Sequence, residues 1–590
     1  NKTCSMSPDV SNPAARDITY DELFDDCCEQ IDGLIEGGVD VILIETVFDT
    51  LNCKAMIDAA FTMMKKRGVE LPVMVSLTVS DLAGRTLSGQ TIEAFLASLS
   101  PYPIFSVGMN CAFGAPQMKP FIERMGKIAP YYISAHPNAG LPNEMGAYDE
   151  TPESMAPQIA EFIDEGLVNI IGGCCGTTPD FIARYAQMAE GKKPHVVTQR
   201  PQYMWLSGLD LLQVDDHVHA PIDSSRFVNV GERCNVAGSR KFLRLINEKS
   251  YEEALGIARK QVADGAAVVD VNMDDGLLDA KAEMVNFLNM IAAEPEIAKV
   301  PIMIDSSKWD VITAGLKCCQ GKCIVNSISL KEGEEVFVAH AKDVLRYGAA
   351  CVVMCFDEVG QATTFERRIE IAERAYHILV DQVGMNPLDI IFDPNVLAIA
   401  TGMEEHDNYA VDFIRATEWI TTHLPGAHVS GGVSNLSFSF RGNTYIREAI
   451  HSVFLHYAQQ KGMDFGIVNA KARMDYHKIP KEQLDIIEDV VLNRRKGAYE
   501  DLIELAAEIK EKADAAKAAK AGGATAPKPA APEWRKDSVE NRLKYALRKG
   551  ISDFLQVDID EALGKYPHAV NVIEGPLMDG MNEVGELFGE

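Results

Sequence analysis

The chain has 590 residues, of which 47% are hydrophobic and 24% are charged. These values are ordinary for globular proteins, so the composition excludes wholesale disorder and fibrous folds, and the length allows roughly four domains of about 150 residues. The net charge of −30 repels nucleic-acid phosphates and anionic lipids, which argues against a nucleic-acid-binding or membrane-surface protein.

The sequence carries no targeting or membrane signal. It has no apolar run of about 18 residues and no signal peptide at its start, so we expect a soluble, cytoplasmic protein. Its 13 cysteines lack the spacing of a disulfide framework, which favours reduced thiols that are buried or metal-bound. The chain begins without Met and ends inside an amphipathic segment, VGELFGE, and from both features we expect a fragment of a longer protein.

Residues 20–176 alternate amphipathic stretches with five short apolar runs, which are VDVILIETV, LPVMVSLTV, PIFSVGMNC, YYISAHPNAG and LVNIIGGCCG. Near-continuous apolar strands separated by helices predict a parallel sheet with both faces covered. Five units are too few for a closed eight-stranded barrel, so we expect about three further units to precede them. We assign residues 1–200 to a (β/α)8 barrel that is incomplete at its N-terminus.

A polar stretch over 201–223 is predicted to be an interdomain linker, and a second series of strands fills 224–490. Its eight apolar runs are RFVNVGER, AAVVDVNMD, VPIMIDSS, KCIVNSIS, ACVVMCFD, LDIIFDPN, HVSGGVSN and DFGIVNA. Eight such units in about 250 residues match a complete (β/α)8 barrel. The predicted fold class is therefore α/β, with two TIM-type barrels in tandem.

The last hundred residues read differently from the barrels. We predict a trailing helix over 491–512 and, over 513–535, a linker rich in Ala, Lys, Pro and Gly that is part helical and part extended. Beyond it, the helical periodicity of 539–554 and 569–588 predicts the N-terminal part of a helical bundle, which we place at 536–590.

Three strand-end cysteines give the sharpest chemical signal. Cys111 closes SVGMNC, and Cys174 and Cys175 follow a strand and two glycines in IIGGCCGTTP. Thiols at the same end of neighbouring parallel strands can converge on one ion; thiolates favour Zn²⁺, and three protein ligands leave a fourth position for a substrate. A substrate thiol bound there would lose its proton and become a nucleophile.

Two other cysteine pairs, Cys27–Cys28 and Cys318–Cys319, lie on helical segments without a glycine frame. We expect them to be ordinary buried or half-buried side chains. The contrast supports the metal interpretation of the glycine-framed cysteines, because glycine permits close approach of the backbone.

The motif GMNC, followed later by GGCCGTTP, resembles the zinc-dependent homocysteine S-methyltransferase domain. The resemblance implies that Cys111, Cys174 and Cys175 bind zinc and act in catalysis, with the homocysteine sulfur as the fourth ligand.

Further motifs fit the same family: ETVFDTLN around Glu45, LSGQ around Ser88 and SAHPNAGLP around Asn138. The resemblance implies that Glu45, Asn110 and Asn138 contact the substrate. One departure is Phe181, which stands where a histidine commonly follows GTTP.

Polar residues crowd the ends of the strands in the second series. They are Glu232, Asn235, Asp270, Asn272, Asp274, Asp305, Asn326, Asp393 and Asn435. A ring of Asp and Asn suits a neutral heterocycle that offers both donors and acceptors, as the edge of a pterin does. A phosphate would instead call for Gly-rich loops and Lys or Arg.

Two cation sites are alternatives for these carboxylates. DVNMDDG resembles the opening of a calcium loop, but Asp275 occupies the glycine position and Lys281 the position of the closing glutamate. A Mg²⁺ site among the same carboxylates remains an alternative, and some of the ring residues are expected to tie loops to helix N-termini instead.

The segments GERCNVAGSR, DVNMD and NSIS are similar to the pterin-binding methyltransferase barrels, relatives of dihydropteroate synthase, and GGVSNLSFSFRG is similar to the folate domain of methionine synthases. The resemblance implies cofactor binding by the ring, with Asp305, Asn326 and Asp393 on the pterin and Asn435 near the nitrogen that bears the methyl group. Methyl departure from a tertiary amine requires protonation or hydrogen bonding at that nitrogen. Asn435 can hydrogen-bond a protonated nitrogen, but it cannot supply the proton.

The final segment, IEGPLMDGMNEVGELFGE, resembles the helical cap that precedes a cobalamin-binding domain. The resemblance implies that Phe588 lies against the upper face of the corrin. The Asp-x-His-x-x-Gly motif, whose histidine ligates cobalt from below, does not occur in this sequence.

In its order of segments the chain resembles the family of cobalamin-dependent methionine synthases. The resemblance implies methyl transfer from 5-methyltetrahydrofolate to cobalamin and then to zinc-activated homocysteine, giving methionine and tetrahydrofolate. Three alternatives remain. The chain could be a corrinoid-dependent methyltransferase with another thiol acceptor, it could be a non-catalytic fragment that binds folate and zinc, or its zinc could be purely structural. We expect a monomer whose partners are these small molecules, with a flavodoxin-type or reductase partner acting only through domains outside this chain.

Overall fold

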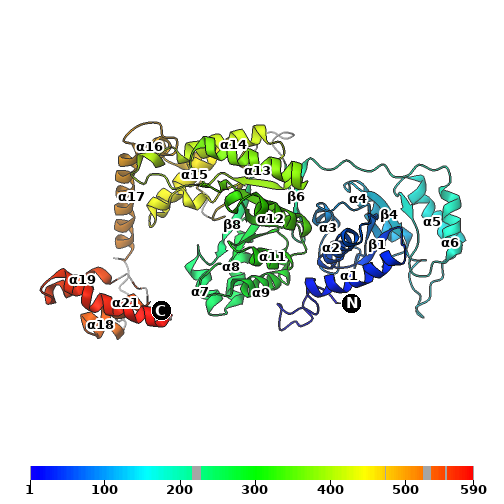
Figure 1. The fold of residues 1–590 in the computed structure, drawn as a ribbon, viewed down its shortest axis with the longest axis horizontal. Helices are drawn as coiled ribbons and strands as arrows, with labels where there is room; N and C mark the ends of the chain where they lie inside the picture. Colours follow the sequence, from blue (N-terminus) through cyan, green and yellow to red (C-terminus); the bar gives the residue numbers. More distant parts are fainter. Residues whose placement is uncertain are drawn as a thin grey trace. The chain divides into compact units, whose positions relative to one another are not determined.

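The computed structural model describes residues 2–215, 227–471, 474–521, 533–549, 551 and 554–588, with side chains throughout except at 513–521, 533 and 584–588 (Figure 1). These residues form two compact units, Asn1–Ile509 and Lys510–Glu590. Among the helices of the described ranges, none combines the length and the apolarity that crossing a membrane requires.

The first part of unit one is a parallel sheet of five strands that follow one another in chain order. The strands are β1 (Ile42–Val47), β2 (Val73–Leu77), β3 (Ser106–Asn110), β4 (Tyr132–His136) and β5 (Ile170–Ile171). The helices are α1 (Tyr20–Glu36), α2 (Thr50–Arg67), α3 (Ile92–Leu99), α4 (Ala115–Gly126), α5 (Pro152–Asp164) and α6 (Pro179–Ala189). The alternation of apolar runs and amphipathic stretches therefore gives the sheet and the helices that it predicts.

This sheet is open. In β1, Ile42 and Ile44 are buried, whereas Leu43 and Glu45, which alternate with them, are exposed. Because alternate residues of a strand face opposite sides, one face of β1 packs on the core and the other meets solvent. Within the described ranges β1 and β5 are the edge strands, so the sheet does not close on itself.

The second part of unit one is an eight-stranded parallel barrel, as the sequence predicts. Its strands are β8 (Val228–Asn235), β9 (Val268–Asn272), β10 (Ile302–Asp305), β11 (Ile324–Ile328), β12 (Ala350–Met354), β15 (Ile390–Asp393), β16 (His428–Val429) and β17 (Phe465–Ile467). Between β16 and β17 the barrel closes through a single parallel bridge, Gly432 to Ile467.

Helices alternate with these strands around the barrel, as Figure 1 shows. They are α7 (Arg240–Asn247), α8 (Tyr251–Ala263), α9 (Ala280–Ala292), α10 (Pro295–Ala298), α11 (Trp309–Leu316), α12 (Glu334–Arg346), α13 (Phe365–His377), α14 (Tyr409–His423), α15 (Thr444–Gln460) and α16 (Lys481–Val491). A short hairpin, β13 (Phe356–Asp357) with β14 (Gly360–Gln361), follows β12.

The stretch predicted to be a linker contains a hairpin instead, β6 (Tyr203–Ser207) paired with β7 (Leu211–Asp215). Its apolar residues Met204, Leu206 and Val214 are buried in one cluster with residues near the starts of the barrel strands, such as Val228 and Val268. The hairpin thus packs on the N-terminal end of the barrel. The barrel residues on which the hairpin packs lie far along the chain. Its short apolar alternation within a polar stretch was therefore not enough to predict two strands.

The sheet and the barrel contact each other through apolar residues, such as Leu51 and Ala55 of α2 in the barrel's core cluster, and through polar side chains. Asp58 of α2 pairs with Arg346 of α12, at 2.8 Å between Oδ1 and Nε. The phenol of Tyr102 donates to the Arg346 carbonyl at 3.2 Å. The fully buried Lys54 of α2 donates from Nζ to the Gly321 carbonyl at 2.7 Å.

The trailing helix α17 (Ala498–Ala521) extends beyond its predicted end near Lys512. The start of the predicted linker, 513–521, is rich in Ala and Lys, which have high helix propensity, and it is the part-helical portion of that prediction. The rest of the predicted linker, 522–532, lies outside the described residues.

Unit two is helical, as the periodicity predicts. It consists of a 3-10 turn (Glu533–Lys536), α18 (Val539–Lys549), α19 (Leu555–Lys565), α20 (Ala569–Val572), a π turn (Ile573–Leu577) and α21 (Met578–Phe588). The helix expected over 539–554 ends at Lys549. The small core contains Val539, Leu543, Ala562 and Val572.

Candidate functional site

The three cysteines singled out by the sequence meet at the carboxyl ends of β3 and β5. The Sγ atoms of Cys111, Cys174 and Cys175 all lie within 4.8 Å of one another, and in the described part of the chain this is the only such group of possible metal ligands. Sγ of Cys175 is 3.7 Å from that of Cys111 and 4.0 Å from that of Cys174. All three side chains are half-buried.

The distances suit one tetrahedral ion. Zn–S bonds of about 2.3 Å at tetrahedral angles place neighbouring sulfurs about 3.8 Å apart. The separations of 3.7 Å and 4.0 Å bracket this value, and the donor set is the soft one that zinc prefers. The residues present therefore fit a zinc ion with an open fourth position.

The local backbone explains why the glycine frame is needed. Cys111 adopts a left-handed φ of 62°, and its N–H donates to the His136 carbonyl at 3.2 Å. A Cβ at Gly172 would lie 2.5 Å from the His136 ring, and one at Gly173 would lie 2.4 Å from the Thr177 hydroxyl. Only glycine lets the backbone after β5 approach β4 this closely.

Asn110, at the end of β3, connects the thiols to β1 and β2. Its Oδ1 accepts from the Ser76 hydroxyl at 2.7 Å and from the Thr46 N–H at 3.0 Å. Its Nδ2 donates to Glu45 at 3.2 Å and lies 3.8 Å from Sγ of Cys174. The amide thus orients an exposed carboxylate and a half-buried thiol at the same edge of the sheet.

The loop after β4 covers the other side of the cluster. Oδ1 of the buried Asn138 accepts from the Cys175 N–H at 3.1 Å. Tyr148, which no sequence motif marked, lies beside Cys175, and burial followed by its interaction with the Cys175 thiol raises the pKa of its phenol. Its ring lies so close to Gly176 that a Cβ there would be 2.5 Å from that of Tyr148. Its signal in the sequence was its place on the Asn138 loop.

Burial raises the pKa of the Cys174 thiol to about 11, and the Asn110 amide opposes this rise. Without a cation, Cys174 therefore keeps its proton at neutral pH. A bound divalent cation deprotonates coordinating thiols outright, so metal binding and proton release are coupled at this site.

Two residues of the family motifs lie away from the thiols. The hydroxyl of Ser88 donates to Oε1 of Gln320 at 2.7 Å, so it belongs to the contact between sheet and barrel. Phe181 is buried in the core, with its ring 6.4 Å from that of Tyr185 in an edge-to-face arrangement. An aromatic side chain at this position packs and offers no ligand atom.

In the barrel, four polar residues of the predicted ring form one layer across neighbouring strands. Asn235 is paired in register with Asn272, Asn272 with Asp305, and Asp305 with Asn326. Nδ2 of Asn235 lies 3.4 Å from Oδ2 of Asp305. The carboxyl ends of β8 to β11 therefore bring amides and a carboxylate to one level.

Burial sets the charge of this ring. It raises the pKa of Asp305 and of Asp393 to about 7 each, against opposing hydrogen bonds from Asn272 and Asn395 respectively. Burial, followed by the nearby Asp305, raises the pKa of Asp270 well above its ordinary range. Oδ1 of Asp270 finds no hydrogen-bond partner among the described residues. At neutral pH the ring thus offers protonated carboxyls, which can donate as well as accept.

Glu232 is connected to the turn that carries Asn435 by Ser434, a residue that no sequence motif marked. The Ser434 hydroxyl donates to Oε2 of Glu232 at 2.8 Å. The exposed Asn435 follows it in a short 3-10 turn, Val433–Asn435. Arg447 of α15 donates to the Ser434 carbonyl at 3.2 Å and holds this turn. No sequence pattern links these positions, because only the closed barrel makes them neighbours.

Asp274 has a structural role. It accepts from the Ser306 hydroxyl and from the Ser307 N–H, both at 2.6 Å. Asp275 likewise accepts from the Leu277 N–H at 2.9 Å. Asp274 therefore ties its loop to the one after β10, Asp275 binds within its own loop, and the metal-ligand geometry found in the described ranges is confined to the thiols.

In unit two the side chain of Phe588 lies outside the described residues, so its proposed contact with a corrin stays a prediction. The same unit exposes an apolar surface on α20, the π turn and α21. Val570, Ile573, Met578 and Met581 are each about half exposed there. An exposed apolar face of this kind fits a large, largely apolar ring.

Three known families match successive parts of the chain. The family model for homocysteine S-methyltransferase matches residues 1–189, that for pterin binding enzyme matches 231–469, and that for the B12 binding domain matches 539–590. Fold and site thus define a methyltransferase that combines homocysteine, pterin and B12 domains. The order of the three domains matches a methionine synthase-like architecture.

Solved structures of other proteins are similar to portions of this chain. The homocysteine methyltransferase MmuM from Escherichia coli is 19% identical over 29% of this chain, with a TM-score of 0.23, and the match spans 57% of MmuM. Dihydropteroate synthase from Yersinia pestis is 16% identical over 47% of this chain and 94% of its own, with a TM-score of 0.31. The enzyme from Stenotrophomonas maltophilia is 18% identical over 42% of this chain and 88% of its own, with a TM-score of 0.31.

Proposed function

We propose that the chain transfers a methyl group from 5-methyltetrahydrofolate, through a protein-bound cobalamin, to zinc-activated homocysteine, giving methionine and tetrahydrofolate. The observation that carries this proposal is the convergence of the three thiols within 4.8 Å in a chain that also holds a buried Asp and Asn ring. Each site matches one half of the reaction.

At the first site, Cys111, Cys174 and Cys175 would hold zinc. Zinc there lowers the pKa of a bound thiol and so keeps the homocysteine sulfur as a thiolate. The Asn110 amide holds Cys174 through the contact with its sulfur, and Asn138 fixes the Cys175 backbone. Glu45, exposed beside Asn110, is placed to attract the ammonium group of an amino acid.

At the second site, the amides of Asn272 and Asn326 and the carboxyls of Asp305 and Asp393 would bind the pterin edge. Because burial holds the pKa of both carboxyls at about 7, each can donate a hydrogen bond to a ring nitrogen or carbonyl. Asn435 would accept a hydrogen bond from the protonated leaving nitrogen.

The buried Asp270 offers a source for the proton that this nitrogen needs. Its pKa is held well above the ordinary range by burial, so it carries a proton at neutral pH. A proton held at the ring would support methyl departure, because an unprotonated tertiary amine is a poor leaving group.

In unit two, cobalamin supplies a cobalt centre that carries the methyl group. The exposed apolar side chains Val570, Ile573, Met578 and Met581 would exclude water from one side of the corrin. Phe588 at the end of α21 is proposed to join them.

Calorimetric titration of the chain with 5-methyltetrahydrofolate tests the barrel assignment. We expect saturable binding that Asp393→Asn weakens, whereas no binding at millimolar ligand would overturn the pterin proposal.

X-ray absorption of the zinc-loaded chain tests the other site. We expect three sulfur ligands that become four only when homocysteine is added. A metal that keeps three sulfurs at saturating homocysteine, and whose removal unfolds the chain, would mark a structural zinc instead.

A further inference from the structure

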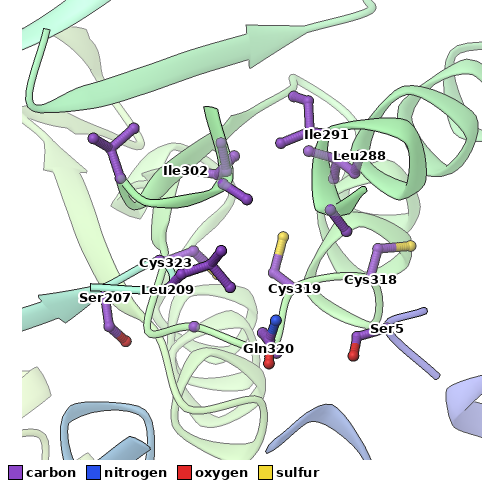
Figure 2. A pocket seen from close by; sticks show the side chains of 15 residues that line it. Ser5, Ser207, Leu209, Leu288, Ile291, Ile302, Cys318, Cys319, Gln320 and Cys323 are labelled. Carbon is purple, nitrogen blue, oxygen red and sulfur yellow. The ribbon is translucent and has the colours of Figure 1, made fainter. Parts of the chain in front are cut away.

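A second group of cysteines lines a cavity where the first sheet and the hairpin meet the barrel. The cavity has a volume of about 50 Å³, which is room for more than one water molecule. Its walls include Ile302, Leu288 and the cysteines of the α11–β11 loop (Figure 2). In this view the sulfur of Cys319 points into the cavity, whereas that of Cys318 points away.

The two cysteines at the ends of the Cys319–Cys323 turn line the same cavity. Gly321 between them lies against the hairpin, so that a Cβ there would be 2.0 Å from the Ser207 carbonyl oxygen. The turn is therefore fixed by its neighbours, and both cysteines are held beside the cavity. Cys318 instead donates to the Ala314 carbonyl at 3.4 Å.

A buried lysine lies beside these two cysteines. Lys54 of α2 is 1% exposed, and its Nζ donates to the carbonyls of Gly321 at 2.7 Å and Cys319 at 3.4 Å. Burial lowers the pKa of Lys54, and the thiols of Cys323 and Cys319 are the strongest influences that oppose this. The Cys319 thiol and then the Lys54 side chain lower the pKa of the Cys323 thiol, against its burial. This makes Cys323 the more acidic of the two thiols.

We propose that Cys319 and Cys323 form an oxidation site that a small hydroperoxide converts to a disulfide, separately from the metal-binding thiols. The Cys323 thiolate attacks the O–O bond, which breaks to give a sulfenic acid and hydroxide or alkoxide. The Cys319 sulfur then attacks the sulfenic sulfur, the S–S bond forms, and water leaves. Two thiols lose two electrons and two protons, and one hydroperoxide is reduced to water and an alcohol, or to two waters for hydrogen peroxide.

The sequence predicts that Cys318 and Cys319 are ordinary buried side chains, whereas the proposal gives Cys319 a redox role. The pair Cys27–Cys28 on α1 serves as a comparison, because among the described residues it lacks a neighbouring buried lysine of this kind. Burial raises the pKa of Cys27 to about 11 and also raises that of Cys28, and no cation lowers the pKa of Cys27. The reactive partner of Cys319 is thus four positions along the chain, not its sequence neighbour.

The test is a peroxide titration of the folded full-length chain, followed by alkylation, tryptic digestion without reductant and mass spectrometry. Trypsin cleaves after Lys317, Lys322 and Lys331, so a disulfide between Cys319 and Cys323 joins two peptides, CCQGK and CIVNSISLK. We expect this joined product in the wild type and in Cys318→Ser, and its loss in Cys319→Ser. We expect Lys54→Met to slow its formation about tenfold, the effect of one pKa unit on thiolate population.

The wild-type digest alone decides the main point, even if a variant folds poorly. Two separately alkylated peptides after peroxide has oxidised Cys111, Cys174 and Cys175 would overturn the proposal. A joined product that survives in Cys319→Ser and disappears in Cys318→Ser would assign the chemistry to the wrong thiol. Equal rates in the wild type and in a folded Lys54→Met variant would remove the role of the cation.

Discussion

At the residue scale, Tyr148 shows how much a site depends on side chains that no motif marks. It belongs to the loop after β4, and its phenol reaches Cys175 while its ring rests on Gly176. A donor beside a metal thiolate orients the ligand and moderates its charge, and such partners affect metal affinity strongly.

We therefore predict that Tyr148→Phe lowers zinc affinity by about tenfold or more, within the range known for residues that support metal ligands. Competition with a chromophoric chelator measures this directly. Tyr132→Phe, at a 44% exposed position on β4, is the matched control and should leave the affinity unchanged. Equal affinities in both variants would mean that the phenol contact does not support the metal.

Asp393 gives the molecule a defined pH dependence. Its folded pKa is raised from 3.8 to about 7 by burial, so the folded state binds the proton more tightly than the unfolded state does. The stabilising effect of that proton is complete below about pH 4 and is lost as the pH rises toward 7. The slope for one such group is at most about 1.4 kcal/mol per pH unit.

Asp393→Asn should therefore raise the unfolding temperature at pH 8 relative to the wild type, with a smaller gain at pH 5. The amide can still accept the hydrogen bond that Asp393 receives from the Asn395 N–H at 2.8 Å. Thermal melts at the two pH values give the comparison, with Asp485→Asn on the surface of α16 as the control. A gain of equal size at both pH values would rule out titration of Asp393 as the cause.

At the scale of elements, the apolar runs predict every strand of the sheet and the barrel, because buried parallel strands leave an unambiguous composition. The segments outside the sheet and the barrel, and the ends of helices, were less predictable. The hairpin β6–β7 depends on contacts with the barrel, and α17 continues to Ala521 through a sequence whose composition also suits a linker. In both cases local composition is compatible with two structures, and tertiary packing or helix propensity selects one.

The residues of the candidate site also fall into those that the sequence could predict and those that it could not. Cys111, Cys174 and the ring residues could be predicted, because strand ends of a parallel barrel meet at one edge. The contact of Ser434 with Glu232 and the position of Lys54 could not be predicted, since they join segments that only the folded chain brings together. Ser88 fitted a family motif, yet it bonds to Gln320 at the contact between sheet and barrel.

The hairpin offers a test of its packing role. Leu206 is fully buried among the starts of the barrel strands, so Leu206→Ala should lower the free energy of unfolding by about 2–5 kcal/mol. Denaturant unfolding measures the change. Leu87→Ala, at a position 53% exposed, should cost far less, and similar losses in the two variants would argue against a packed hairpin.

At the scale of the whole molecule, unit one depends on the contact between sheet and barrel. Asp58 of α2 is 5% exposed, accepts from the Tyr20 phenol at 3.1 Å and pairs with Arg346 at 2.8 Å. The pair lies beside Tyr20, Leu51 and Ala55 of the first part, which are buried in the same cluster as the barrel core, so its removal should weaken the coupling of the two parts.

We expect Asp58→Asn to destabilise the chain by about 1 kcal/mol, a modest loss because Arg346 is partly solvated, and to broaden the melting transition. Calorimetric melting is the measurement. Asp32→Asn removes a similar but exposed pair with Arg67 inside the first sheet and should leave the transition sharp. An unchanged width in Asp58→Asn would show that the two parts are coupled by other contacts.

The closure of the barrel between β16 and β17 has a kinetic consequence. This seam has one backbone bridge, Gly432 to Ile467. Two backbone hydrogen bonds also cross it, from the Asp464 N–H to the Val429 carbonyl at 3.2 Å and from the Ile467 N–H to the Gly431 carbonyl at 3.0 Å, and the buried side chains of His428 and Asp464 add to the connection. Local opening favours places with few ladder hydrogen bonds. Amide hydrogens along this seam should therefore exchange with solvent before those of β9 to β12. The barrel would then open transiently beside the turn that carries Asn435, on the timescale that hydrogen exchange measures.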